Sequence, residues 1–186
     1  MEKSVAFNPL LFFLCYATLN NKLITLDNGH FHPTEQVGDK ISAILQFVPE
    51  LLLHVTRGVR WDSDHVVILN DEIQLIACEI VRANALNRVN IGLDYFDASI
   101  NRIGAYVVGT RAAQQAFLIA LLEPTAKIKA WEEAGKNFER LAMMELMKTM
   151  PFGAVWNYFC MISNVPVGAE FIDEIQKYEA EVLSKR

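Results

Sequence analysis

The sequence contains few cysteines, and its basic residues are neither abundant nor clustered. Cys15, Cys78 and Cys160 are odd in number and lack CxxC spacing, which argues against a disulfide framework or a thiolate zinc site and favours a reducing compartment. Seventeen Lys and Arg against 22 Asp and Glu leave a formal net charge of -5, with no basic patch to neutralise phosphates. We therefore expect a cytoplasmic protein that does not bind nucleic acid.

The sequence also lacks an uninterrupted hydrophobic run of membrane-spanning length. The uncharged stretch from Ser4 to Asn21 comes closest, but Asn8-Pro9 and Asn20-Asn21 interrupt it, and no small-residue cleavage site follows. A signal peptide is the weaker interpretation of this stretch. We expect no membrane segment, and predict here a helix that would normally be buried against neighbouring elements.

Three short apolar runs predict the strands of a buried parallel sheet. They span Leu23 to Leu26, Leu51 to Val55 and Val89 to Leu93, and their hydrophobicity is continuous rather than alternating. Two helical patterns separate them: one opens at Pro33-Thr34 and closes at Pro49, and the other is capped by Asn70-Asp71. Alternating strands and helices are typical of βαβ units.

After the third run the sequence predicts only helices. The predicted ranges are 98–122, with a break at Gly109-Thr110, then 138–150, 152–163 and 169–185, the last of them an amphipathic cover. No linker or repeat divides the chain, so residues 1–186 are expected to form a single domain. Three parallel strands make an incomplete sheet, because such a sheet is normally covered on both faces and either closed or extended.

Acidic and histidine side chains gather where the predicted strands end, which is where sites form in α/β barrels and open parallel sheets. Such residues follow the first run, lie within and beyond the second, and follow the third: Asp27, His30, His32, His54, Asp62, Asp64, His65, Asp94 and Asp97. Carboxylate and imidazole ligands without thiolates suit Mn, Mg, Fe or Zn, and Mn best fits a mixed oxygen and nitrogen site.

Each of these features also has a structural interpretation. An isolated Asp-x-Asp, such as Asp62 and Asp64, is more often a turn or helix cap than a metal site. An isolated histidine in an apolar strand, such as His54, is more often a hydrogen-bonded core residue. His32 and His65 are interpreted as structural. If the segment around Ser63 is extended, however, the two carboxylates point the same way and can share one cation.

Three segments closely resemble bacterial L-rhamnose isomerases. They are Leu26-Asp27-Asn28-Gly29-His30-Phe31-His32-Pro33-Thr34-Glu35, Val59-Arg60-Trp61-Asp62-Ser63-Asp64-His65-Val66 and the run from Gly92 to Ile103. The resemblance extends from about Tyr16 to Arg186 and leaves residues 1–15 unmatched. It implies that residues 16–123 form the last three β/α units of a partial (β/α)8 TIM barrel, followed by a C-terminal helical extension over residues 124–186.

The resemblance also implies an activity and a site. Family members interconvert L-rhamnose and L-rhamnulose by a metal-assisted shift of hydrogen between C2 and C1, and they form homotetramers. By motif, His30, Asp62 and Asp64 correspond to the ligands of a catalytic Mn²⁺. Asp27, His54 and Asp94 correspond to ligands of a second, structural metal such as Zn²⁺ or Mn²⁺ that touches substrate, and Asp94 to a group that moves protons between sugar oxygens.

The chain departs from the family in length. Family members are more than twice as long, and their earlier strands supply a metal-binding glutamate, a catalytic lysine and most of the sugar pocket. We therefore expect little or no isomerase activity from this chain alone. The alternatives are a non-catalytic remnant or a split-gene half that assembles with the missing N-terminal half. Another metal-dependent barrel enzyme, such as a hydrolase or epimerase, is a third hypothesis.

Overall fold

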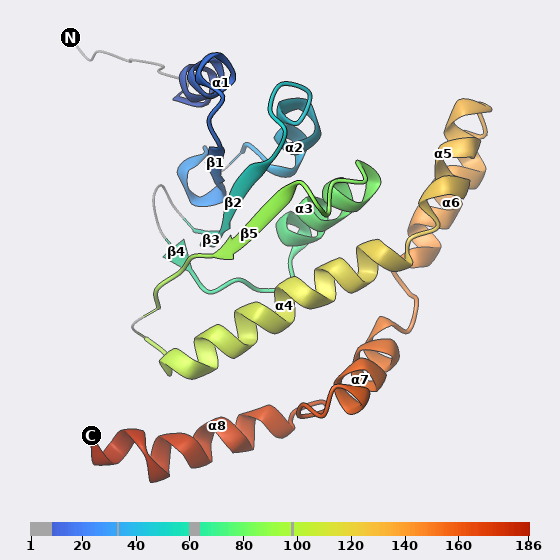
Figure 1. The fold of residues 1–186 in the computed structure, drawn as a ribbon. Helices are drawn as coiled ribbons and strands as arrows, with labels where there is room; N and C mark the ends of the chain where they lie inside the picture. The colour runs from blue at the N-terminus through green and yellow to red at the C-terminus, as the bar shows by residue number, and fades with distance from the viewer. Residues whose placement is uncertain (1–8, 33, 60–63, 98) are drawn as a thin grey trace.

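The computed structural model describes residues 9–32, 34–59, 64–97 and 99–186 as an α/β fold (Figure 1). Its elements, in chain order, are α1 (Pro9–Asn20), β1 (Ile24–Asp27), the 3₁₀ turn η1 (Asn28–His30), α2 (Gly38–Ile44), β2 (Leu51–Val55), β3 (Arg57–Gly58), β4 (Asp64–His65), α3 (Asp71–Arg82), β5 (Val89–Leu93), α4 (Arg102–Leu122), α5 (Thr125–Glu133), α6 (Asn137–Met147), α7 (Phe152–Ile162), α8 (Glu170–Glu181) and η2 (Leu183–Lys185).

The three predicted strands form one parallel sheet in the order β1-β2-β5. Asp27 pairs with His54 across the first two strands, and His54 pairs with Gly92 across the next two. The parallel arrangement predicted from the sequence is confirmed. A two-stranded antiparallel ribbon, β3-β4, lies between β2 and α3 in the chain.

The two faces of the sheet have different surroundings. One face carries the buried side chains of the core, among them Leu26, Leu51 and Leu53, which are at most 1% exposed. Side chains of the opposite parity, such as Thr25 and Asn90, are exposed. This chain therefore covers one face of its sheet and leaves the other open.

Helices α2, α3 and α4 cover the apolar face in chain order, each packed against the next (Figure 1). Helix α3 begins at Asp71 because the side chain of Asn70 accepts a hydrogen bond from the Ile73 N–H at 3.2 Å. Its apolar positions Ile76 and Ile80 are fully buried. The capped amphipathic helix predicted at this place is confirmed.

Helix α2 begins later than the sequence predicted. The residues expected to open it form a turn instead, because the Glu35 N–H donates to the His32 carbonyl at 2.7 Å and the Thr34 N–H donates to His32 Nδ1 at 3.2 Å. The first helical residue is Gly38 rather than Thr34.

Helix α4 is continuous through Gly109, so the break predicted there is wrong. The glycine is required by packing, because a Cβ at residue 109 would overlap the Tyr95 hydroxyl oxygen. That hydroxyl donates to the carbonyls of Ala105 and Tyr106 at 3.2 and 3.3 Å. Gly109 thus gives space to a buried tyrosine that ties the end of β5 to α4.

The helices after α4 lie outside the sheet, with α7 and α8 running back alongside α4 (Figure 1). Helices α6, α7 and α8 correspond to predicted ranges, whereas α5 was not predicted. The Arg111 guanidinium of α4 joins the last two helices to the rest, because it lies 5.2 Å from the Trp156 ring and 4.5 Å from the Phe171 ring. It also donates to the carbonyl of Pro166 at 3.2 Å.

Two apolar helices remain partly exposed. In α1, Leu11, Phe12 and Leu19 are 61%, 56% and 84% exposed, so this helix is largely uncovered within the described part of the chain. Helix α4 has the length and composition that could cross a bilayer, but core helices share these features. Its alanine-rich stripe, including Ala112 and Ala116, is buried.

We expect Gly109→Ala to destabilise the fold. The intrinsic helix preference for alanine would favour the variant by about 1 kcal/mol, but the overlap with Tyr95 costs about 1–3 kcal/mol and should dominate. Urea unfolding measures the net effect. Gly153→Ala is the control, because a Cβ there has no atom of the described residues within 4 Å, and it should leave stability unchanged or raise it. Equal stabilisation by both substitutions would contradict this account.

Candidate metal centre

Parallel pairing brings three metal-ligating side chains together at the carboxyl end of the sheet. Asp27 is the last residue of β1, and His54 lies beside it on β2. Asp94 follows β5, where its N–H donates to the Val55 carbonyl at 3.0 Å. These side chains have the parity of the open face, since His54 pairs with Gly92, two residues before Asp94.

The distances between these groups suit a shared divalent cation. His54 Nδ1 lies 3.6 Å from Asp27 Oδ2 and 3.4 Å from Asp94 Oδ2. One ligand atom from each residue lies within 4.8 Å of the others. Ligands that share an ion at about 2.1 Å can be at most about 4.2 Å apart, so shifts of a few tenths of an ångström would suffice. Two carboxylates and one imidazole therefore fit a hard or borderline metal ion.

The three side chains differ in their access to solvent. The Asp27 side chain is 13% exposed, and its Oδ1 accepts a hydrogen bond from the Gly29 N–H at 2.9 Å. The Asp94 side chain is 42% exposed. Asp27 is thus the fixed member of the group, while Asp94 is open to molecules approaching from the uncovered face of the sheet.

His30 and Asp64 lie next to this group, whereas Asp62 falls outside the described residues. His30 Nε2 is 3.8 Å from Asp27 Oδ2. Asp64 Oδ1 and Asp27 Oδ1 lie 3.1 and 3.3 Å from the position that a Cβ on Gly29 would occupy. The structure therefore brings His30 and Asp64 to the same end of the sheet. The predicted convergence of His30, Asp62 and Asp64 on one ion stays a prediction.

A side chain at residue 29 would block this arrangement. Its Cβ would lie 2.8 Å from Thr56 Cγ2, in addition to its contacts with the two carboxylates. Glycine thus allows the turn after β1 to pass close to the end of β2. This close approach gives a physical reason for Asn28-Gly29 between Asp27 and His30.

The other two histidines have side-chain contacts with residues outside the Asp27, His54 and Asp94 group. His32 Nδ1 lies 2.6 Å from the Thr34 hydroxyl in the same turn. His65 Nδ1 lies 3.8 Å from Asp97 Oδ2. The Ser99 hydroxyl and backbone N–H both donate to the Asp97 carboxylate and hold the pKa of Asp97 below its ordinary value, with smaller help from His65. These contacts agree with structural roles for His32 and His65.

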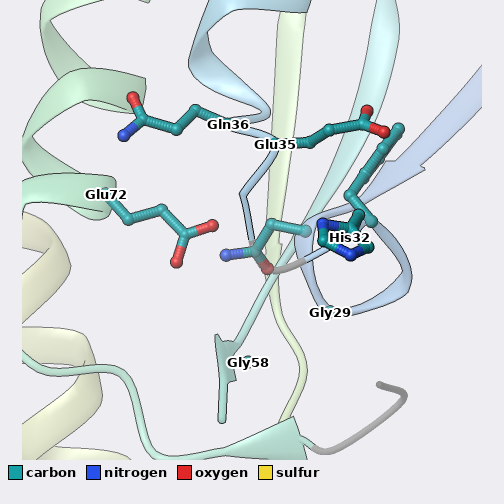
Figure 2. A pocket seen from close by; sticks show the side chains of 8 residues that line it. Gly29, His32, Glu35, Gln36, Gly58 and Glu72 are labelled. Carbon is teal, nitrogen blue, oxygen red and sulfur yellow. The ribbon is translucent and has the colours of Figure 1, made fainter. Parts of the chain in front are cut away.

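A polar cavity of about 120 Å³ adjoins the turn after β1, and the sequence did not reveal it. In Figure 2 the Glu72 side chain points from α3 toward the segment that carries His32. Burial raises the pKa of Glu72 above its ordinary value of 4.5, and a hydrogen bond with the Asn28 side chain offsets part of that rise. Glu72 lies 44 residues beyond Asn28 in sequence, so spacing alone could not have predicted their contact.

Comparison with known proteins identifies one family. Residues 4–186 match the family model described as L-rhamnose isomerase (RhaA), a match that includes most of the segment before Tyr16. Proteins named L-rhamnose isomerase from Bacteroides thetaiotaomicron, Rhodopirellula baltica and Escherichia coli are 60%, 54% and 55% identical to the chain over 175 residues. Each alignment covers 94% of this chain but only 42%, 41% and 42% of the relative. The chain thus spans about two-fifths of the length of these relatives.

We expect His54→Gln to weaken binding of Mn²⁺ or Zn²⁺ by at least about tenfold, because it removes the imidazole between the two carboxylates. Isothermal titration calorimetry measures the dissociation constant. His32→Gln is the matched control and should bind as the unmodified chain does, since the His32 ring contacts Thr34 within its own turn. Equal affinities for all three proteins would exclude His54 as a ligand.

We also expect Glu72 to make stability depend on pH. Its pKa is raised in the folded chain, so the native state binds more protons than the unfolded state in the range above 4.5. Its contribution to stability is therefore present below pH 4.5 and is lost as pH rises through the folded pKa. Glu72→Gln should remove this dependence, so its stability relative to the unmodified chain should increase from pH 4.5 upward.

Urea unfolding at a series of pH values measures this difference. Glu79→Gln, a substitution of the same kind on the same helix, serves as the control for loss of a carboxylate. A constant difference between the Glu72→Gln variant and the unmodified chain across this pH range would contradict the assignment.

Proposed function

Because the chain belongs to the L-rhamnose isomerase family, we propose that it supplies the C-terminal part of a metal-dependent active site that interconverts L-rhamnose and L-rhamnulose. The observation that carries this proposal is the meeting of Asp27, His54 and Asp94 at the carboxyl ends of three neighbouring parallel strands. This is the end at which α/β barrels assemble their active sites.

The topology supports placement of this chain in a (β/α)8 barrel. Successive strands are added on the same side, in the order β1-β2-β5, and the helices that cover them pack in succession. In a doubly wound open sheet, the order in which successive strands are added reverses at one point of the sheet. The polar, uncovered face of the sheet then corresponds to the barrel interior, and the three strands to its last three β/α units.

The proposed ligand sets follow the family motifs. His30, Asp62 and Asp64 would hold a catalytic Mn²⁺. Asp27, His54 and Asp94 would hold a second divalent metal, Zn²⁺ or Mn²⁺. The short distances from Asp27 to both His54 and His30 support two neighbouring sites rather than one isolated site.

When bound, divalent cations at these ligands would polarise the sugar carbonyl as Lewis acids and orient the two reacting oxygens of the sugar. The protein groups would divide the remaining work. Asp27, with its low exposure and its bond from the Gly29 N–H, fixes the position of the site. Asp94, which is more exposed, is the group that can accept a proton from a sugar hydroxyl and return it to the neighbouring oxygen.

The helices beyond the sheet support a role in assembly. Helices α6 and α7 expose large apolar side chains, including Phe138 (78%), Leu141 (58%) and Ile162 (60%). Large apolar side chains exposed on helices outside the core are compatible with subunit interfaces. We propose that these helices take part in a homotetramer of a cytoplasmic enzyme.

A second candidate function is that of an assembly piece without activity of its own. The uncovered sheet face and the two edge strands β1 and β5 favour it, because an incomplete parallel sheet offers both backbone pairing and side-chain packing to a partner. On this proposal the partner is a polypeptide that contains the earlier barrel strands. Both candidates predict that the chain alone lacks a complete sugar pocket.

We expect the purified chain to show no measurable turnover of L-rhamnose. Co-expression with the remaining N-terminal part of the 60% identical Bacteroides thetaiotaomicron relative should give isomerase activity. EDTA should abolish this activity, and added Mn²⁺ should recover it. The His54→Gln chain in the same co-expression is the control and should associate without restoring activity.

Three outcomes separate the candidates. Restored turnover supports the contribution to an active site, and stable association without turnover supports the assembly piece. Turnover of L-rhamnose by the chain alone would contradict the proposal that its active site is incomplete.

A further inference from the structure

Two polar residues, Asn28 and Thr56, are buried within the described part of the chain, and the side chain of Asn28 hydrogen-bonds to the backbone of Thr56. Asn28 is 6% exposed and Thr56 is 3% exposed. Asn28 Nδ2 donates to the Thr56 carbonyl at 2.7 Å, and the Thr56 N–H donates to Asn28 Oδ1, also at 2.7 Å. We call this pair of hydrogen bonds the Asn28–Thr56 clamp.

The clamp extends the sheet beyond its last paired strand residues. Backbone pairing of β1 with β2 ends at Asp27 and His54, where β1 turns into η1. The Asn28 amide then provides one donor and one acceptor to the Thr56 backbone, as a strand residue would. The end of β2 is thereby held against the turn that carries Asp27 and His30.

Further hydrogen bonds connect the clamp to the segments that carry the other proposed ligands. The Thr56 hydroxyl donates to the His65 carbonyl at 3.2 Å, next to Asp64. The Phe96 N–H donates to the Asp64 carbonyl at 2.9 Å, which joins that segment to the chain after β5. A continuous series of bonds thus links the segments that carry Asp27, Asp64 and Asp94.

An amide makes both bonds of the clamp at any pH, whereas an ionised carboxylate cannot. A carboxylate at residue 28 would still accept from the Thr56 N–H but could not donate to the Thr56 carbonyl. It would also place a negative charge beside the carboxylate of Glu72, which has a side-chain hydrogen bond with Asn28. An alanine would leave the buried Thr56 N–H without its acceptor.

We propose that Asn28 is a positioning residue for the metal centre, and that the Asn28–Thr56 clamp sets the separation of the ligand-bearing turns before any ion binds. The inference rests on the proposed function, because it assumes that these turns hold divalent cations. Asn28 acts through the backbone of Thr56 and touches neither ion nor sugar. Supporting groups of this kind commonly change metal affinity by about 10–100-fold when they are lost.

The test compares Mn²⁺ binding by the full 186-residue chain and its Asn28→Asp variant at a temperature where both are folded. The expected result is a dissociation constant about 10–100-fold higher for the variant. Asn101→Asp is the control: it adds the same charge, keeps the acceptor that caps α4 through the Gly104 N–H, and should bind Mn²⁺ as the unmodified chain does.

A thermal unfolding curve for each protein separates positioning from stability. A lower melting temperature with unchanged Mn²⁺ affinity would overturn the inference, because Asn28 would then serve the fold alone. If the unmodified chain binds no Mn²⁺, the proposed function fails first, and this inference fails with it.

A second variant keeps the proposal testable if Asn28→Asp does not fold. Thr56→Val preserves the shape of the side chain and both backbone bonds of the clamp but removes the bond to the His65 carbonyl. Weaker Mn²⁺ binding by this variant supports the proposed link, and unchanged binding contradicts it.

Discussion

The register of the parallel sheet is the constraint on which the candidate metal centre depends. Because Asp27 is paired with His54, and His54 with Gly92, the polar side chains of three strands lie on one face at one end. A slip of one residue in β2 would turn His54 toward the helices and bring Leu53 or Val55 to the site. The apolar core prevents that slip, since Leu51, Leu53 and Val55 are buried beneath α2 and α3.

The same alternation gives the molecule two unlike sides. One face of the sheet packs against the core, and the other face presents polar residues. Strands β1 and β5 form the two edges of the sheet. Parallel sheets are normally covered on both faces. The chain spans about two-fifths of the length of its relatives, and the open side is where elements of a longer protein would complete a barrel under the proposed function.

The candidate metal centre depends on groups with different tasks. Asp27, His54 and Asp94 present candidate ligand atoms, whereas Gly29, Asn28 and Thr56 allow or hold the close approach of the segments that carry them. The first group consists of Asp and His side chains, which are recognisable in a sequence as candidate metal ligands. The second consists of a glycine, an amide and a hydroxyl, whose importance depends on which backbone each lies against.

The sequence by itself determined the three strands, helix α3 and the candidate ligands, because continuous apolar runs, helix caps and acidic residues after strands are local patterns. It also identified the family through three long motifs. It misplaced the start of α2, because the Thr34 and Glu35 N–H groups bond to His32 in a turn instead of opening a helix. It predicted a break at Gly109, because the space required by Tyr95 depends on a contact between two elements. Only the tertiary structure decided which candidate ligands meet, that the Asn28 side chain hydrogen-bonds to Thr56, and that Glu72 lies partly buried beside them, because these contacts join residues 27 or more positions apart.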